Sequence, residues 1–210
     1  MIPTCIVAAT SPELENLALS PNQFDVLITG VGTAATVYYL TKKIQQSKPS
    51  LIIQAGIAGS FDESIPLGTT VIVQKDRFAD LGVQEQNQWK DVFDMKLSEP
   101  GSAPFSNGWL INPHLRGFSN LAIQQVTSIS INEVTTNIQR IHHYREKYQP
   151  NIESMEGAAF HYVCLQENIP FLQVRTISNY VGERDKSRWQ MKLAIQNLGN
   201  SLQQIISNLA

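Results

Sequence analysis

The chain has 210 residues and a formal net charge of −2, with 42% hydrophobic and 16% charged residues. This length and balance are typical of one globular domain with a substantial core, and we expect a single domain over residues 1–210. The near-neutral charge gives no electrostatic footprint for nucleic acid or for an anionic membrane, so we expect neither as a partner.

The chain also lacks the marks of a membrane or secreted protein. No apolar run approaches the roughly 20 residues of a membrane span. The first residues carry no basic segment ahead of an apolar stretch, so we expect no signal peptide and a cytoplasmic protein. Cys5 and Cys164 lie in apolar runs without metal-ligand spacing and are expected to be reduced core residues. The four histidines lack such spacing too, and we expect no metal and no cofactor.

Short apolar runs alternate with helical patterns along the chain. The apolar runs predict strands at 6–9, 24–29, 51–55, 69–75, 121–126 and 170–177. The helical patterns predict helices at 12–19, 33–46, 133–148, 155–167 and 187–209. This alternation indicates an α/β layered fold with parallel strand pairs, which binds ligands at the carboxyl ends of its strands. The polar stretch 84–117 is long for a loop, so we expect some strand within it.

Two glycine-rich segments follow predicted strands. Gly30 to Ala35 superficially fits a dinucleotide fingerprint, but no acidic residue ends the next strand to hold a ribose, which disfavours that interpretation. A tight turn and a ligand-contacting turn stay equally open, because backbone N–H groups there can face a ligand oxygen. Gly56 to Gly59 is interpreted as a second such turn. No Lys or Arg precedes Lys42, so a phosphate clamp at these turns would need a distant arginine.

Three polar residues are candidates for chemistry. Glu156 begins a predicted helix among small residues, where it suits a group that binds sugar hydroxyls, although an ordinary acid at a helix start is the plain alternative. Asn179 is expected just past the end of a strand, where it suits a group that reads a base edge, although a turn-forming Asn is the plain alternative. Glu13 follows the first strand and is either a general base or a solvated glutamate at a helix start.

The segments Ser154-Met-Glu-Gly-Ala158 and Arg175-Thr-Ile-Ser-Asn179 resemble the nucleoside phosphorylase and nucleosidase superfamily, and the two glycine segments add support. The likeness spans most of the chain and weakens between residues 84 and 120. Within that superfamily, the stretches 154–160 and 177–186 are most similar to the futalosine hydrolase family. The resemblance implies a three-layer α/β/α fold with a central mixed sheet. It also implies a homo-oligomer, a dimer or higher, acting on a small-molecule nucleoside and water.

The resemblance also implies roles for single residues. Met155 and Glu156 fall on the ribose-binding pair, and Glu13 falls on the glutamate that activates water. Asn179 falls on the base-reading position. A further pair, Ile131 and Asn132, lies where the family covers the purine and offers backbone hydrogen bonds. Ile131 departs from the aromatic residue of the adenine-cleaving nucleosidases, and Ile57 departs from their serine.

The amide of Asn179 favours a 6-oxopurine. An amide donates to the O6 acceptor of hypoxanthine, whereas a carboxylate would face it acceptor against acceptor. An amide cannot act as a general acid, so departure of the base would depend on hydrogen bonding and on a proton from solvent. The implied reaction is hydrolysis of futalosine to hypoxanthine and dehypoxanthine futalosine, in menaquinone biosynthesis. The alternatives are a phosphorolytic 6-oxopurine nucleoside phosphorylase, a methylthioadenosine/adenosylhomocysteine nucleosidase and a non-catalytic nucleoside-binding module.

Overall fold

The computed structural model describes residues 4–17, 24–86 and 88–208. Its main element is a mixed sheet with strand order β10-β4-β8-β9-β3-β1-β2, in which β7 pairs with β4. A further pairing of β10 with β3 closes five of these strands into a ring. The strands are β1 Thr4–Ala8, β2 Phe24–Ile28, β3 Ile52–Ser60, β4 Thr70–Asp76, β7 Leu110–Ile111, β8 Gln125–Ser130, β9 Ile152–Ser154 and β10 Phe171–Tyr180.

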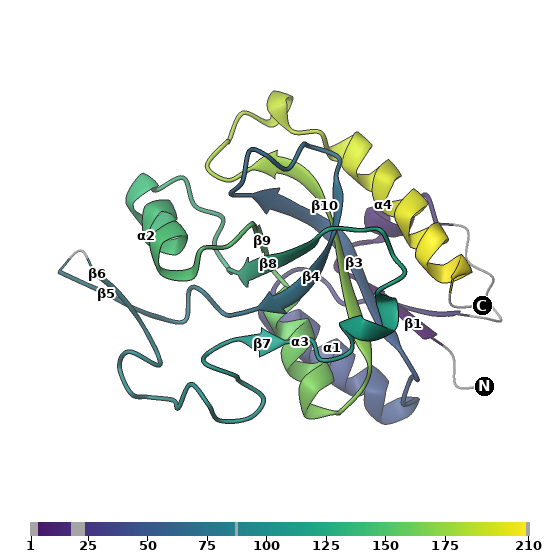
Figure 1. Cartoon of the computed structure of the whole chain (residues 1–210), viewed down its shortest axis with the longest axis horizontal. Helices are drawn as coiled ribbons and strands as arrows, with labels where there is room; N and C mark the ends of the chain where they lie inside the picture. The colour runs from purple at the N-terminus through teal and green to yellow at the C-terminus, as the bar shows by residue number, and fades with distance from the viewer. Residues whose placement is uncertain (1–3, 18–23, 87, 209–210) are drawn as a thin grey trace.

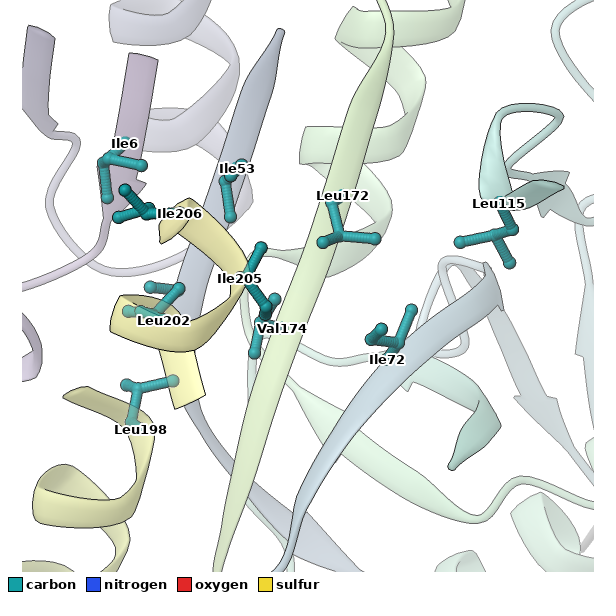
Figure 2. Packing of buried hydrophobic residues seen from close by; sticks show 11 residues of the cluster. Ile6, Ile53, Ile72, Leu115, Leu172, Val174, Leu198, Leu202, Ile205 and Ile206 are labelled. Atoms are coloured by element: carbon teal, nitrogen blue, oxygen red, sulfur yellow. The ribbon is translucent and has the colours of Figure 1, made fainter. Parts of the chain in front are cut away.

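Helices cover both faces of the sheet (Figure 1). Helix α4 (Met191–Ser207) places Leu198, Leu202 and Ile205 on one face, against strand residues that include Val174 (Figure 2). Helices α1 (Thr33–Gln46) and α3 (Gly157–Gln166) pack on the opposite face. Helix α2 (Ile138–Tyr148) packs against Ile129 and Ile131 at the carboxyl end of β8. The three-layer α/β/α fold with a mixed sheet is therefore confirmed.

The two central strands explain why the sheet lies between helix layers. In β10, the nine residues before Tyr180 are buried, and in β3 all residues but Ile57 are buried. Continuous burial of this kind is typical of strands that are covered on both faces. Cys5 and Cys164 lie in the core between β1, α1 and α3 as free thiols, as expected. Within the described residues, no helix is both long enough and apolar enough to cross a bilayer.

Several predicted elements are confirmed and others have different bounds. Helix α1 has the predicted bounds, and the strands predicted at 6–9, 24–29 and 69–75 are found within two residues. The strand predicted at 121–126 is shifted, because β8 begins at Gln125. Helix α2 begins five residues later than predicted, because the Asn137 side chain accepts from the N–H groups of Gln139 and Arg140 and so caps the helix there.

Three further predicted helices also have bounds that differ from the prediction. The helix predicted at 12–19 is a short 3₁₀ turn, Ser11–Leu14, and positions 18 and 19 lie outside the described residues. The helix predicted at 187–209 is divided into a 3₁₀ turn, Lys186–Arg188, and α4, and position 209 again lies outside the described residues. The helix predicted at 155–167 begins at Gly157, which leaves the two preceding residues in the connection from β9.

Two corrections concern the candidate site. Gly56 to Gly59 is not a turn, because it lies inside β3. Asn179 is not beyond its strand, because β10 continues to Tyr180 and pairs Asn179 with Gly59. Both strands were expected to end earlier, where glycine and polar residues interrupt the apolar pattern.

The polar stretch 84–117 contains short strands, as expected. A hairpin of β5 (Gly82–Glu85) and β6 (Gln88–Asp91) projects from the main sheet (Figure 1). Tyr148 of α2 holds β6 in place, because its hydroxyl accepts from Trp89 Nε1 at 2.9 Å and donates to Asp91 Oδ2 at 3.2 Å. A 3₁₀ turn, Leu115–Phe118, returns the chain toward β8.

Candidate active site

A cavity of about 590 Å³ lies near the carboxyl ends of β1, β3 and β10. This volume is in the usual range for a small-molecule site, and this edge of the sheet is the usual place for one in an α/β fold. Apolar side chains, among them Val31, Val134 and Trp189, form much of its wall. Its polar wall consists of Thr10, Glu13, Glu153, Ser154, Glu156, Ser178 and Asn179. Among the described residues, no Lys or Arg lines it.

Glu13 is a buried group of this cavity and not a solvated glutamate at a helix start. Its side chain is 7% exposed, because the 3₁₀ turn after β1 directs it inward. Oε2 accepts from the backbone N–H of Thr10 at 2.9 Å and from its hydroxyl at 3.1 Å. Oε1 accepts from the N–H of Ile57 at 3.3 Å. These bonds hold the carboxylate in one orientation, as a catalytic base requires.

Glu156 stands at the start of α3 without capping it. The first N–H groups of the helix are instead bound by serine hydroxyls, Gly157 N–H by Ser154 and Ala158 N–H by Ser130. The Glu156 carboxylate is therefore free to turn into the cavity wall. Its Oε1 accepts from Gly32 N–H at 3.0 Å, so this amide of the first glycine turn binds protein and not ligand.

Arg175 is the arginine that sequence reasoning did not place. It is buried in the middle of β10, and Nη1 lies 3.7 Å from Glu156 Oε2 while Nη2 donates to Gln54 Oε1 at 2.9 Å. A β-carbon at Gly56 would lie 2.1 Å from Arg175 Nη1 and 2.9 Å from Glu13 Oε1. Gly56 thus makes room for the guanidinium between the two glutamates. A cation, Arg175, therefore lies beside the second glycine segment, which was not expected. It pairs with the Glu156 carboxylate and does not line the cavity.

Asn179 lines the cavity with a fixed amide. Its Oδ1 accepts from Ser178 Oγ at 2.8 Å, and its Nδ2 donates to the Tyr180 carbonyl at 3.1 Å. An amide nitrogen carries two hydrogens, so one remains for a ligand acceptor. Asn179 thus keeps one donor for a ligand in the cavity that it lines.

The other predicted residues divide into two groups. Met155 and Ile131 line the cavity, and the Ile131 N–H is bound by the Ser154 carbonyl at 3.0 Å. Asn132 is exposed and is not part of the wall. Its N–H and side-chain amide bind Asp80, and its Oδ1 accepts from Thr33 N–H at 3.4 Å. A contact of Asn132 with a ligand stays a prediction.

Glu153 is a cavity residue that sequence reasoning did not single out. It lies on β9, a three-residue strand without a clear pattern, next to the Ser154-Met-Glu156 motif. It is 6% exposed, and burial raises the pKa of its carboxyl to about 7. Its nearness to the motif was the one available signal. In the part of the chain that the structure describes, no group of His, Cys, Asp and Glu is placed to hold a metal ion.

Carboxylates and one oriented amide around a cavity at the carboxyl edge of a mixed α/β sheet are typical of an enzyme site for a hydroxyl-bearing substrate. A model of the Phosphorylase superfamily matches residues 23–209. The chain therefore belongs to this superfamily.

Its relatives include nucleosidases of two kinds. The chain is 25% identical over 186 residues to futalosine hydrolase of Thermus thermophilus, covering 88% of this chain and 81% of that protein. It is 23% identical over 192 residues to 5'-methylthioadenosine/S-adenosylhomocysteine nucleosidase of Pseudoalteromonas translucida, covering 87% and 78%. The crystal structure of the latter enzyme from Helicobacter pylori matches with a TM-score of 0.79 and 15% identity, covering 99% of both chains. At that identity the structural match shows the fold.

Proposed function

We propose that this chain is an N-glycosyl hydrolase that cleaves the N-ribosidic bond of futalosine and releases hypoxanthine and dehypoxanthine futalosine. The observation that carries the proposal is one cavity that brings together Glu13, Glu156 and Asn179 and whose described wall has no Lys or Arg. The similarity to futalosine hydrolase of Thermus thermophilus supports it.

Glu156 would hold the ribose. Gly32 N–H and Arg175 fix its carboxylate, and the remaining lone pairs accept from the 2′ and 3′ hydroxyls. Met155 precedes it on the cavity wall and packs against the sugar. This fixes the sugar while the C1′–N9 bond lengthens toward an oxocarbenium-like state, as in glycoside hydrolysis.

Glu13 would be the base that takes a proton from water as it adds at C1′. Its Oε1 and the Arg175 guanidinium both lie beside Gly56, so the carboxylate is held near the base of the cavity wall. The attacking water would lie on the cavity side of Glu13, toward the ribose that Glu156 holds.

Asn179 would read the base, with Ile131 against the purine face. The amide hydrogen that Tyr180 does not take would donate to the O6 acceptor of hypoxanthine in the cavity that Asn179 lines. Adenine presents an amino donor there, which would meet this donor unfavourably. The amide therefore favours a 6-oxopurine over the adenine of methylthioadenosine.

Hydrolysis is favoured over phosphorolysis by the charge of the wall. Phosphate is bound in proteins by Arg, Lys or free backbone N–H groups. The wall presents three glutamates, while Arg175 is engaged by Glu156 and Gln54 and Gly32 N–H by Glu156. A phosphate dianion would therefore be repelled where water would be accepted.

Three wider features belong to the same proposal. Futalosine cleavage places the chain in menaquinone biosynthesis. The cytoplasm is the proposed location, because both cysteines are free buried thiols, as is usual in a reducing compartment. A homo-oligomer is proposed because Val31 and Val134 at the cavity are 56% and 42% exposed and suit an apolar neighbour. Light scattering of the purified chain tests this last point.

The test of the reaction is a product assay. The purified chain is incubated with futalosine, inosine and methylthioadenosine, each with and without phosphate, and the products are separated and identified. We expect hypoxanthine from futalosine at a rate that phosphate does not change. A phosphate-dependent rate would make the chain a phosphorylase, and faster release of adenine would make it an adenine nucleosidase. Binding without turnover would make it a non-catalytic module.

A further inference from the structure

The carboxyl of Glu153 has no part in the mechanism above, although it lines the same cavity. It is 6% exposed, and its Oε2 is buried without a hydrogen-bond partner among the described residues. A buried carboxyl without a partner costs free energy. A ligand that bonds this carboxyl would remove that cost.

Glu153 and Asn179 lie on either side of Gly59 in the sheet. In the sheet, Gly59 of β3 pairs with Asn179 of β10 on one side and with Glu153 of β9 on the other. A β-carbon at Gly59 would lie 3.3 Å from Asn179 Nδ2 and 3.4 Å from Glu153 Cγ, so both side chains stand on its face of the sheet. The gap left by the glycine therefore has an amide on one side and a carboxyl on the other, and all three residues line the cavity.

The surroundings of Glu153 favour its protonated form. Burial raises its pKa to about 7, so much of it carries a proton at neutral pH. The neighbouring strand β8 presents Ile129, and β10 presents the neutral Asn179. The titratable neighbour from α2 is Tyr144, which stays neutral because burial raises its pKa to about 12.

We propose that Glu153 is the acid that protonates the departing 6-oxopurine while Asn179 orients it. The inference rests on the proposed function and supplies the acid that an amide cannot be. As the C1′–N9 bond breaks, its electron pair moves onto the base, and the Glu153 O–H proton passes to N7. The proton lost by the attacking water goes to Glu13. After product release Glu13 returns a proton to solvent and Glu153 takes one up, so the cycle balances.

The test compares two leaving groups in the Glu153→Gln variant. Futalosine needs a proton on its base, whereas 4-nitrophenyl riboside releases a stable phenolate without one. We expect kcat on futalosine to fall by about 10²- to 10⁴-fold, the usual contribution of an acid catalyst, and kcat on the nitrophenyl riboside to change less than about threefold. The fall of wild-type kcat/KM above about pH 7 should disappear in the variant. Glu146→Gln, an exposed glutamate on α2, is the matched control and should equal wild type.

Two results would overturn the inference. Equal loss on both substrates would mean that Glu153 maintains the site's structure, and unchanged futalosine turnover would mean that it has no catalytic part. Failure of the proposed function looks different, because then the wild-type chain itself releases no hypoxanthine from futalosine. The nitrophenyl riboside rate also reports whether the variant is folded.

Discussion

Arg175 Nη1 lies 3.7 Å from Glu156 Oε2 in the interior of the protein, with 2% and 7% of the two side chains exposed. The pair links β10 to the start of α3, and it holds the carboxylate that we assign to the ribose. A charged pair this deeply buried is costly to form, but breaking it is costlier still, because one charge is left without a partner.

Arg175→Met should therefore destabilise the chain by about 3 kcal/mol, the usual cost of leaving a buried charge unpaired. Urea unfolding measures this. Combining it with Glu156→Gln should recover part of the loss, since no charge is then stranded, and the two substitutions should be coupled by more than about 1 kcal/mol. Simple additivity would contradict the assigned pairing.

Gly56→Ala should displace Arg175 and Glu13, whose side chains occupy the space beside Gly56. The added β-carbon would meet Arg175 Nη1 at 2.1 Å and Glu13 Oε1 at 2.9 Å, so both groups must move. We expect kcat to fall at least about 100-fold, the usual effect of misplacing catalytic groups by about 1 Å, and stability to fall by about 1–3 kcal/mol. Gly101→Ala is the matched control, because nothing lies within 4 Å of its added carbon. Wild-type kcat in Gly56→Ala would contradict the assignment of this space.

Glu13→Gln should lower kcat on futalosine by about 10²- to 10⁴-fold with little change in KM, because it removes the base and leaves the ribose and purine contacts intact. The amide keeps the size of the carboxyl, so the fold should be unchanged by circular dichroism. Glu15→Gln, two residues along and exposed, serves as control. Near-full turnover by Glu13→Gln would exclude it as the base.

The sequence predicted the helices and strands of the fold better than it predicted where β3 and β10 end in the site. Helix α1 has strong periodicity and was predicted with its observed bounds. In β3 and β10 the apolar pattern stops early, because Gly56 gives its side-chain space to Arg175 and because the cavity requires polar residues at the strand ends. Polar residues that line the cavity thus stand where the strands reach it, and the apolar pattern that predicts a strand is lost there.

Site residues that stand out by themselves in the sequence were predicted. Site residues whose position depends on the pairing of two strands were missed. Glu13, Glu156 and Asn179 stood out as polar residues at element ends, and all three line the cavity. Arg175 and Glu153 lie within strands, and the role of each depends on the β3 glycine beside it, Gly56 for Arg175 and Gly59 for Glu153. Strand register is not visible in one sequence, so neither partner could be predicted.

Asn179→Asp should shift base preference from 6-oxopurine toward 6-aminopurine nucleosides. A carboxylate cannot donate to O6 but accepts from the N6 amino group of adenine. The ratio of kcat/KM for inosine to that for adenosine should fall by about 10²-fold or more, given that a lost buried polar partner is worth up to about 10⁴. An unchanged ratio would remove Asn179 from base selection.

Glu153→Gln should make the folded protein more stable at high pH and leave it unchanged at low pH. Burial raises the folded-state pKa of Glu153 from 4.5 to about 7, so between these values the folded chain keeps a proton that the unfolded chain has released. Unfolding free energy therefore falls as pH rises through this window, and the full cost is present above about pH 7. Gln carries no charge and avoids this cost, which amounts to at most about 3 kcal/mol, because each tenfold change in proton affinity is worth about 1.36 kcal/mol. Urea unfolding at pH 4 and pH 8 measures the difference, and a variant less stable than wild type at pH 8 would show that the carboxylate has stabilising partners. A gain in stability together with slower release of hypoxanthine would place this carboxyl among groups that are kept for chemistry at the expense of the fold.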